Sequence, residues 1–490
     1  MKSVNMPPDA PTLMWSTRAI GYTTPAAVAD LIDNSISANA TNISIQFVSG
    51  ENCYISILDD GEGMSRDELK IAMKYGSSNP LQERSASDLG RFGLGLKTAS
   101  LSQCKQLTVV SKKNGKTSAY CWDLDHVLFA ESWELLELEQ DDIATLPQIN
   151  TLTNLKEGTI VLWDKLDKIF AGDENKEQGL LLRIKEVEEH LALTFHRYLQ
   201  GEPGLKKINI TSNGIPIKPK DPFYIAKSDE LPSEKIPVRY STSNGNSAID
   251  NVFVTPYILP FSDALSQEEL DALGGKEGLI KNQGFYIYRN KRLIVAADWF
   301  RLTRKTDLTK LCRVKVDIPN TLDEIWTIDV KKSMALPPEV VLRNLRRIVA
   351  PIVKAGKRKY KFRATKETTS EKSQIWIPLE TRNGIVYRIN TDYPILRDIL
   401  AETKDKRKLQ TLLRILEQNI PVNAIHTNFY DDKKFAFEDV DLAYQNVLEN
   451  LRDLLRDVSP ELRKDELDDL MSIMPFAEYD IKFTDLGDIV

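Results

Sequence analysis

The fold is decided by a short run of the sequence, Tyr54-Ile55-Ser56-Ile57-Leu58-Asp59-Asp60-Gly61-Glu62-Gly63-Met64. Its apolar first half predicts a strand, and the two glycines that follow forbid regular structure and allow close backbone approach. A carboxylate at the end of that strand only accepts hydrogen bonds, which suits it to the exocyclic amine of adenine. A calcium loop is the competing interpretation, but the series of oxygen ligands at alternate positions stops at Gly63 and Met64.

A helix expected to begin at Thr24-Pro25 carries a second set of polar residues. Thr24 suits the N-cap and Pro25 the first helical position. Asp30 and Asn34 are spaced i, i+4 and share one face, with Asp33 beside them. An amide oxygen is a suitable ligand for Mg²⁺, and a carboxylate one turn away is placed to orient or deprotonate a water molecule. A polar helix face is the alternative explanation of this pattern alone.

Two further patterns contain residue types that suit nucleotide binding. The first is Gly90-Arg91-Phe92-Gly93-Leu94-Gly95-Leu96-Lys97-Thr98. Its glycines leave amide groups free to cradle phosphates at the start of a helix near Leu96. The spacing of Gly90 and Gly95 is that of a P-loop, but Leu96 stands where a P-loop has lysine. The second is Glu157-Gly158-Thr159, in which a hydroxyl that could bond a base edge begins a strand.

Length and composition indicate a globular protein of two to four domains. The chain has 490 residues, of which 42% are apolar and 28% charged, so disorder as the main state is excluded. No apolar run is long enough to span a bilayer and the N-terminus lacks a signal-peptide pattern, so we expect a cytoplasmic protein without membrane partners. Four cysteines without a C-x-x-C and four histidines spell out neither a disulfide framework nor a zinc site.

The charge is distributed unevenly along the chain. Residues 431–490 hold 17 acids against 7 bases, so the net charge of −6 leaves the preceding 430 residues at about +4. A stretch without any acid could follow a phosphate backbone, although a solvated helix face explains it equally well. Its ten basic residues are Arg343, Arg346, Arg347, Lys354, Lys357, Arg358, Lys359, Lys361, Arg363 and Lys366.

The order of predicted elements divides the chain into four parts. Helices and mostly antiparallel strands predict an α+β fold, with an α/β sandwich over residues 1–205. Residues 206–353 form a second α/β unit that begins with a strand at 208–211, and a basic linker covers 354–372. Residues 373–490 are a mixed α/β region that becomes helical and acidic. Other expected features are a capping box at Ser65 and Glu68 and strands at 43–47, 54–58, 107–111, 117–122, 159–163, 285–289, 313–317, 326–330, 375–379 and 385–389.

Together and in this order, the four patterns resemble the signature motifs of the GHKL ATPases. This class includes gyrase, the ninety-kilodalton heat-shock chaperone, sensor histidine kinases and MutL. The runs at 29–35, 59–64 and 90–100 are most similar to the MORC (microrchidia) branch in its prokaryotic form. The resemblance, which covers about residues 15–165, implies the Bergerat fold, an α/β sandwich in which ATP lies between helices and sheet under a closing lid.

The resemblance also implies roles for individual residues. Asn34 would hold Mg²⁺, Asp59 would bond the adenine amine, and Thr159 would lie near the base beside Asp59. The remaining positions expected in the ATP site are Gly61 and Gly63, which give room to the base, Gly93, Gly95 and Lys97, which embrace the phosphates, and Asp33, Met64, Gly90, Leu94 and Thr98.

The chain departs from the pattern of hydrolysing members at the catalytic base, where those members carry glutamate. Asp30 is one methylene shorter, so we expect slow but real ATP hydrolysis. In these enzymes a transducer domain, of the ribosomal S5-like type, follows the nucleotide domain and sends a catalytic lysine to the γ-phosphate. Lys331 and Lys332 are the candidates for it, and the strand-turn at 285–293 would line the same inner surface.

The resemblance implies an ATP-gated clamp, in which nucleotide orders the lid, two nucleotide domains form a homodimer, and hydrolysis releases them. DNA is the expected substrate, and prokaryotic relatives are associated with defence against foreign DNA. No nuclease signature stands out, so cutting would belong to a separate effector protein. A heat-shock-type chaperone acting on protein clients is the alternative, although its long middle and C-terminal domains do not obviously fit. A sensor kinase has the reverse domain order, and a topoisomerase subunit remains possible.

Overall fold

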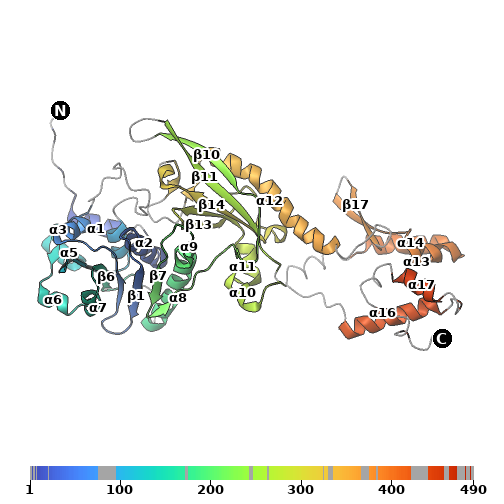
Figure 1. Ribbon diagram of the computed structural model, residues 1–490, viewed down its shortest axis with the longest axis horizontal. Coiled ribbons are helices and arrows are strands. Elements are labelled where there is room, and N and C mark those ends of the chain that lie inside the picture. The colour runs from blue at the N-terminus through green and yellow to red at the C-terminus, as the bar shows by residue number, and fades with distance from the viewer. Residues whose placement is uncertain are drawn as a thin grey trace. The chain divides into compact units, whose positions relative to one another are not determined.

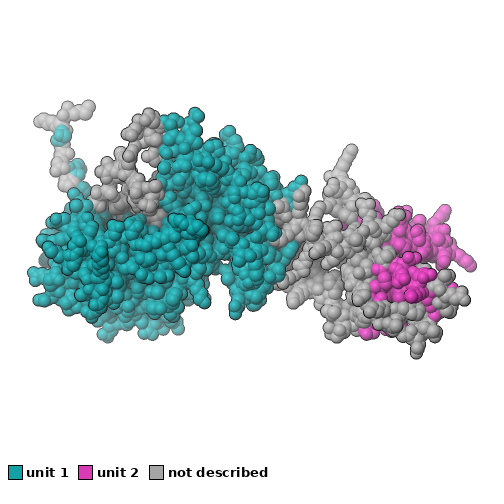
Figure 2. Space-filling model, in the orientation of Figure 1, with its two compact units in different colours: residues 1–357 teal, residues 358–490 magenta. Residues whose placement is uncertain are grey.

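The computed structural model describes most of the chain, in two compact units. The described residues are 8–19, 21–75, 95–170, 175–241, 247–261, 264–323, 325–328, 335–365, 375–381, 384–420, 440–456 and 463–471, with positions 3, 6, 459, 481 and 486. The units comprise residues 1–357 and 358–490 (Figure 2). No helix among the described residues is long and apolar enough to cross a bilayer.

The first unit is built on an eight-stranded sheet of the described residues, in the order β5-β4-β3-β6-β2-β1-β7-β8. Figure 1 labels β6, β1 and β7 of this sheet. Neighbouring strands are antiparallel except β1 and β7, which are parallel. The strands are β1 Asn42–Val48, β2 Tyr54–Asp59, β3 Gln106–Lys113, β4 Lys116–Asp123, β5 Leu136–Glu137, β6 Gly158–Asp164, β7 Asn209–Ser212 and β8 Ile215–Pro216.

Apolar residues on both faces of this sheet pack against helices. On one face Ile45, Ile57 and Trp163 join a core with side chains of α1, α2, α4 and α8. On the other, Val110 and Ile160 pack with residues of α6 and α7. The prediction of an α+β fold, with an α/β sandwich in the N-terminal part of the chain, is therefore confirmed. The helices are α1 Ala10–Arg18, α2 Thr24–Ser37, α3 Arg66–Met73, α4 Gly95–Leu101, α5 Leu124–Ala130, α6 Gln140–Ala144, α7 Ile149–Asn154, α8 Lys176–Thr194 and α9 His196–Gln200.

Local sequence signals agree with these elements to within a residue or two. Ser65 and Glu68 form the expected reciprocal capping box at the start of α3. The N-cap of α2 is Thr23, which accepts a hydrogen bond from the amide of Ala26, so the prediction that Thr24 is the cap is wrong by one residue. Thr24 is instead helical and donates its hydroxyl to Gln103.

A second sheet follows α9 in the same unit. Its order is β10-β11-β14-β12-β13, with the short β9 paired to β11. The strand expected to open this second α/β unit is β7, which instead pairs in parallel with β1 of the first sheet. The remaining strands and helices are β9 Asp229–Glu230, β10 Glu234–Ser241, β11 Ser247–Ile258, α10 Gln267–Ala272, α11 Gly275–Lys281, β12 Gly284–Arg289, β13 Arg292–Asp298, β14 Cys312–Ile318, the pair β15 Thr327–Ile328 and β16 Ala335–Leu336, and α12 Glu339–Thr365, besides 3₁₀ turns at Asp307–Thr309 and Asn320–Leu322.

The helix α12 extends into the segment for which the sequence predicts a linker. Val341, Leu345 and Ile352 form its buried face, and the helix continues to Thr365, well into the segment 354–372 for which a linker is expected. Lysine and arginine favour helices, and the single glycine of residues 354–365 is not enough to end one. The mean polarity of a segment is thus a poor guide to whether it is helical.

In the second unit the end of α12 is followed by an antiparallel hairpin and then by helices. Leu451 and Leu455 of one helix pack with Leu467 of another and with Tyr393 in a small core. The elements are β17 Trp376–Thr381, β18 Gly384–Ile389, α13 Pro394–Glu402, α14 Lys406–Gln418, α16 Val440–Leu455 and α17 Arg463–Leu470.

Candidate functional site

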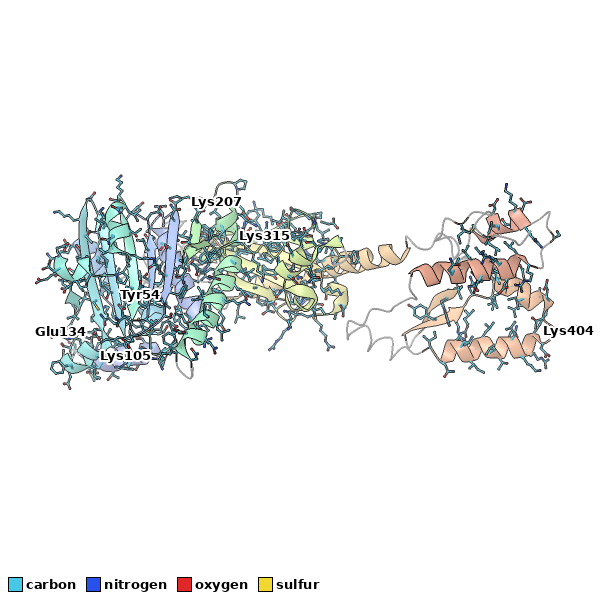
Figure 3. All side chains as sticks on the ribbon, turned by 90° about the horizontal axis from the view of Figure 1, so that it is seen from below. Tyr54, Lys105, Glu134, Lys207, Lys315 and Lys404 are labelled. Atoms are coloured by element: carbon cyan, nitrogen blue, oxygen red, sulfur yellow. The ribbon has the colours of Figure 1, made fainter. Side chains whose placement is uncertain are left out.

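The candidate site begins where two central strands pair. β2 runs from Tyr54, labelled in Figure 3, to Asp59, and its antiparallel neighbour β6 places Thr159 directly opposite Asp59. The acidic run after β2 and the Glu157-Gly158-Thr159 run, about a hundred residues apart in sequence, are therefore adjacent. This agrees with the expectation that Thr159 lies beside Asp59.

Asp59 is a buried carboxylate whose hydrogen bonds leave it able to accept more. The hydroxyl of Ser35 donates to Oδ2 at 2.8 Å, and the amide of Gly61 donates to Oδ1 at 2.9 Å. Burial raises the pKa of Asp59, and these hydrogen bonds only partly oppose that rise. Since an ionised carboxylate accepts about four hydrogen bonds, a donor such as an exocyclic amine fits this group.

The glycines of the loop are required by close backbone contacts. At Gly63, which has a φ of +60°, a Cβ atom would lie 2.1 Å from the carbonyl oxygen of Lys112. At Gly61 a Cβ atom would lie 2.8 Å from the carbonyl oxygen of Ala38. Larger residues at either position would push the loop away from the sheet.

A serine that the sequence analysis does not single out connects the two motifs. The hydroxyl of Ser111, on β3, accepts a hydrogen bond from the amide of Met64 at 2.8 Å and lies 2.8 Å from the hydroxyl of Thr159. It also contacts the carbonyl oxygen of Gly158 at 3.2 Å. Nothing near Ser111 in sequence marks it, because the strand pairing of β3 with β6 alone creates these contacts.

The polar residues of α2 have different surroundings. Asp30 is buried and accepts a hydrogen bond from the hydroxyl of Tyr22 at 2.9 Å, whereas the side chain of Asn34 is exposed. Asp33 is fully buried. Oδ2 of Asp30 lies 3.5 Å from where a Cβ atom of Gly95 would be, so α2 and the start of α4 are adjacent.

Lys97, expected to contact phosphates, is buried in α4 with Thr98. Its ammonium group donates a hydrogen bond at 2.7 Å to the carbonyl oxygen of Ala72, in α3. Burial lowers the pKa of Lys97 to about 8. Five other predicted positions, Gly90, Gly93, Leu94, Lys331 and Lys332, lie outside the described residues.

A residue of the second sheet also reaches α2. Arg292, on β13, is buried, and its Nε donates to Asp33 at 3.2 Å. One of its terminal nitrogens lies 3.9 Å from Oδ1 of Asp30. The strand-turn at 285–293 is expected to face the ATP site, but no sequence signal distinguishes Arg292 from its neighbour Arg289, which pairs with Asp323.

Comparison with known proteins assigns this region to a family. Residues 22–159, which include all four motifs, match the histidine kinase-, DNA gyrase B-, and HSP90-like ATPase family. These residues are a GHKL ATPase domain, and the resemblance inferred from the motifs is confirmed. ATPase is the class of activity of this family.

The relatives include MORC and MutL proteins. The ATPase morc-1 of Caenorhabditis elegans is 34% identical over 95 residues, which are 19% of this chain and 11% of that protein. The DNA mismatch repair protein MutL of Thermosipho melanesiensis is 33% identical over 95 residues, 19% of this chain and 17% of MutL. MutL of Dictyoglomus thermophilum is 33% identical over 89 residues, which are 18% of this chain and 16% of that protein. The matched segment thus spans less than a fifth of each of these curated relatives.

Proposed function

We propose that this protein is a MORC-like ATPase that binds ATP with Mg²⁺ and hydrolyses it slowly. The observation that carries the proposal is the buried carboxylate of Asp59, set opposite Thr159 at the end of β2 and enclosed by a loop that requires Gly61 and Gly63. In this proposal Asp59 accepts the adenine amine and the glycines leave room for the base. Asp33, Met64, Gly90, Gly93, Leu94, Gly95, Lys97 and Thr98 complete the site.

Asn34 would contribute the amide oxygen that holds Mg²⁺, since its side chain is exposed on the same helix as Asp30. Among the described residues no group of three or more His, Cys, Asp or Glu could hold a metal, so phosphate oxygens and water would supply the other ligands. The ion would neutralise phosphate charge during the reaction.

Asp30 is proposed as the general base that takes a proton from the attacking water. Its burial and its hydrogen bond from Tyr22 hold the carboxylate in one orientation. Because aspartate is one methylene shorter than glutamate, the water lies farther from the base and turnover is slow. Lys331 or Lys332 would meet the γ-phosphate from residues 206–353, which we propose act as a transducer domain.

We further propose that ATP joins two chains into a clamp that acts on DNA. On α12 the side chains of Arg343, Arg346 and Lys354 are exposed, and Arg347 pairs with Glu234 at 3.0 Å. This basic face supports contact with phosphates. We propose a role in defence against foreign DNA, with cutting carried out by a separate effector protein.

The test combines ATP binding with phosphate release in the full-length chain. Asp30→Ala should lower phosphate release by about 10²–10⁴-fold while leaving the Kd for ATP within about threefold. Asp60→Asn is the matched control, since Asp60 bonds the amides of Thr41 and Asn42 and not the ATP site. If the wild type neither binds nor hydrolyses ATP, the proposal is wrong.

A further inference from the structure

A single arginine joins the second sheet to the helix that carries the proposed base. Arg292 is only 3% exposed, and its Nε donates to Asp33 of α2 at 3.2 Å. The same guanidinium has a terminal nitrogen 3.9 Å from Oδ1 of Asp30, and another that donates to the carbonyl oxygen of Leu293 at 3.0 Å. One cation from β13 therefore lies beside two buried carboxylates spaced one turn apart.

The backbone that holds Arg292 is fixed by a tight turn. Asn290 and Lys291, between β12 and β13, both have a positive φ, of 47° and 69°. The hydroxyl of Tyr198 on α9 donates to the carbonyl oxygen of Asn290 at 2.7 Å, and the guanidinium of Arg292 lies 5.9 Å from the ring centre of Phe195. The backbone position of Arg292 is thus tied to the β12–β13 hairpin and to α9.

On its other side Asp30 is held by two loop residues beside α2 and α4. Tyr22 donates its hydroxyl to Oδ2 of Asp30 at 2.9 Å, and Gln103 donates to the backbone carbonyl oxygen of Tyr22 at 3.1 Å. Asp30 thus has Tyr22 on one oxygen and the charge of Arg292 near the other. The contact with Tyr22 lies within the part of the chain that forms the first sheet and its helices. The contact with Arg292 depends on the position of the second sheet.

Charge explains why Arg292 matters for the orientation of this helix face. Ionised carboxylates are held in a protein interior when a cation lies next to them. His190 of α8 does not supply that charge, because burial and then the nearby guanidinium of Arg292 lower its pKa to about 4. Removing Arg292 would take away the positive charge that lies beside Asp30 and Asp33, and α2 would have to adjust.

We propose that Arg292 is a positioning residue for ATP hydrolysis, through which the second sheet controls the orientation of Asp30. It acts by anchoring Asp33 and by placing positive charge beside Asp30, without touching the nucleotide. The proposal rests on the role of Asp30 as the base. It predicts that a displacement of the β12–β13 hairpin lowers turnover even when ATP remains bound.

The test compares R292M, R292K and D33N in the full-length chain, with R289M as the matched control. Arg289 is also a buried strand arginine and is the cross-strand partner of Arg292, but it pairs with Asp323 and not with α2. Three quantities are measured: the single-turnover rate of ATP hydrolysis, the Kd for ATP, and hydrogen exchange of α2 amides without nucleotide.

We expect R292M and D33N to lower the hydrolysis rate by about tenfold or more, and R292M to leave the Kd for ATP within about twofold. Exchange of α2 amides should be faster in both variants and unchanged in R289M. R292K restores the charge but not the planar geometry, so it should recover part of the rate.

The outcomes separate this proposal from the proposed function. If R292M hydrolyses ATP at the wild-type rate, or slows no more than R289M, Arg292 has no positioning role. Equal losses of rate and ATP affinity would indicate general damage and would overturn the proposal as well. If the wild type itself shows no hydrolysis, the role of Asp30 fails first, and that result is visible before any variant is made.

Discussion

Replacing Asp59 with asparagine should strengthen the folded protein while weakening ATP binding. The asparagine side chain is nearly isosteric with that of aspartate, and both hydrogen-bond partners of Asp59 can be kept. The amide oxygen can accept from the backbone N–H of Gly61, and the hydroxyl of Ser35 can rotate to accept from the new NH₂ group. What changes is the charge. Burial raises the pKa of Asp59 despite these hydrogen bonds, so ionisation of this carboxyl is less favourable in the folded chain than in the unfolded chain.

The sign and size of the effect follow from linkage. A carboxyl whose pKa is raised by folding destabilises the fold at pH values above that pKa, by about 1.4 kcal/mol for each pH unit that separates its folded and unfolded pKa values. D59N removes this penalty, and each kcal/mol corresponds to about 2–4 °C in Tm for a domain of this size. Binding changes in the opposite direction, because the adenine amine loses its acceptor. An unsatisfied buried donor costs about 1–3 kcal/mol, which is roughly a 5- to 150-fold increase in Kd.

The assay is thermal unfolding of the nucleotide-free chain, combined with ATP titration. At pH 7.5 D59N should unfold at a higher temperature than the wild type, and the gap should narrow as the pH falls and Asp59 takes up a proton. D60N is a control in which stability should change in the opposite direction. Burial acts to raise the pKa of Asp60, but the hydrogen bonds from Asn42 and Thr41 together outweigh it and lower this pKa. A D59N variant that binds ATP like the wild type, or unfolds at a lower temperature at pH 7.5, would refute this reasoning.

Three further perturbations test other parts of the account. G63A should lower the free energy of unfolding by about 2–4 kcal/mol in urea denaturation. G115A is the control and should lower it by about 1 kcal/mol, because Gly115 has a similar φ of 74° but open space where a Cβ atom would lie. Equal losses in the two variants would refute the role of the backbone contact at Gly63. The pKa of Lys97 is about 8 in the folded chain and higher in the unfolded chain. Between pH 8 and 10 the free energy of unfolding of the wild type should therefore rise by about 1.4 kcal/mol per pH unit relative to that of K97M. Curves of Tm against pH that run parallel for the two proteins would contradict this. The double change R343Q and R346Q should weaken DNA binding and reduce the slope of log K against log salt by about 2, as measured by fluorescence anisotropy. The control is the same change at two exposed lysines of α8, Lys176 and Lys185. An equal loss of DNA binding in that control would show that α12 is not part of the DNA interface.

Sequence patterns predict those parts of the site that depend on neighbours in the chain. The strand before Asp59, the capping box of Ser65 and the strands expected at 107–111 and 117–122 are all encoded within a few residues. The motifs at 59–64 and 157–159 also indicate a common site, because their residue types suit one ligand. Their direct pairing through β2 and β6 is then a consequence of sheet order.

The rest of the site depends on contacts between distant segments. Ser111 and Tyr22 are ordinary residues of a strand and a loop until the fold brings them to Thr159 and Asp30. Sequence patterns do not predict β10 either. Ile236 and Val238 are buried at alternate positions there, but Pro237 between them argues against a strand. Proline is tolerated at this position because β10 is at the edge of its sheet.

The central claim, an ATP-operated clamp, is tested most directly by light scattering during size-exclusion chromatography. The full-length chain is measured with Mg²⁺ and either a slowly hydrolysed ATP analogue or ADP, with and without duplex DNA. We predict that the analogue doubles the mass, that ADP does not, that D59N stays monomeric under the same conditions, and that DNA elutes with the dimer. A chain whose mass is the same with the analogue, with ADP and without nucleotide would contradict it.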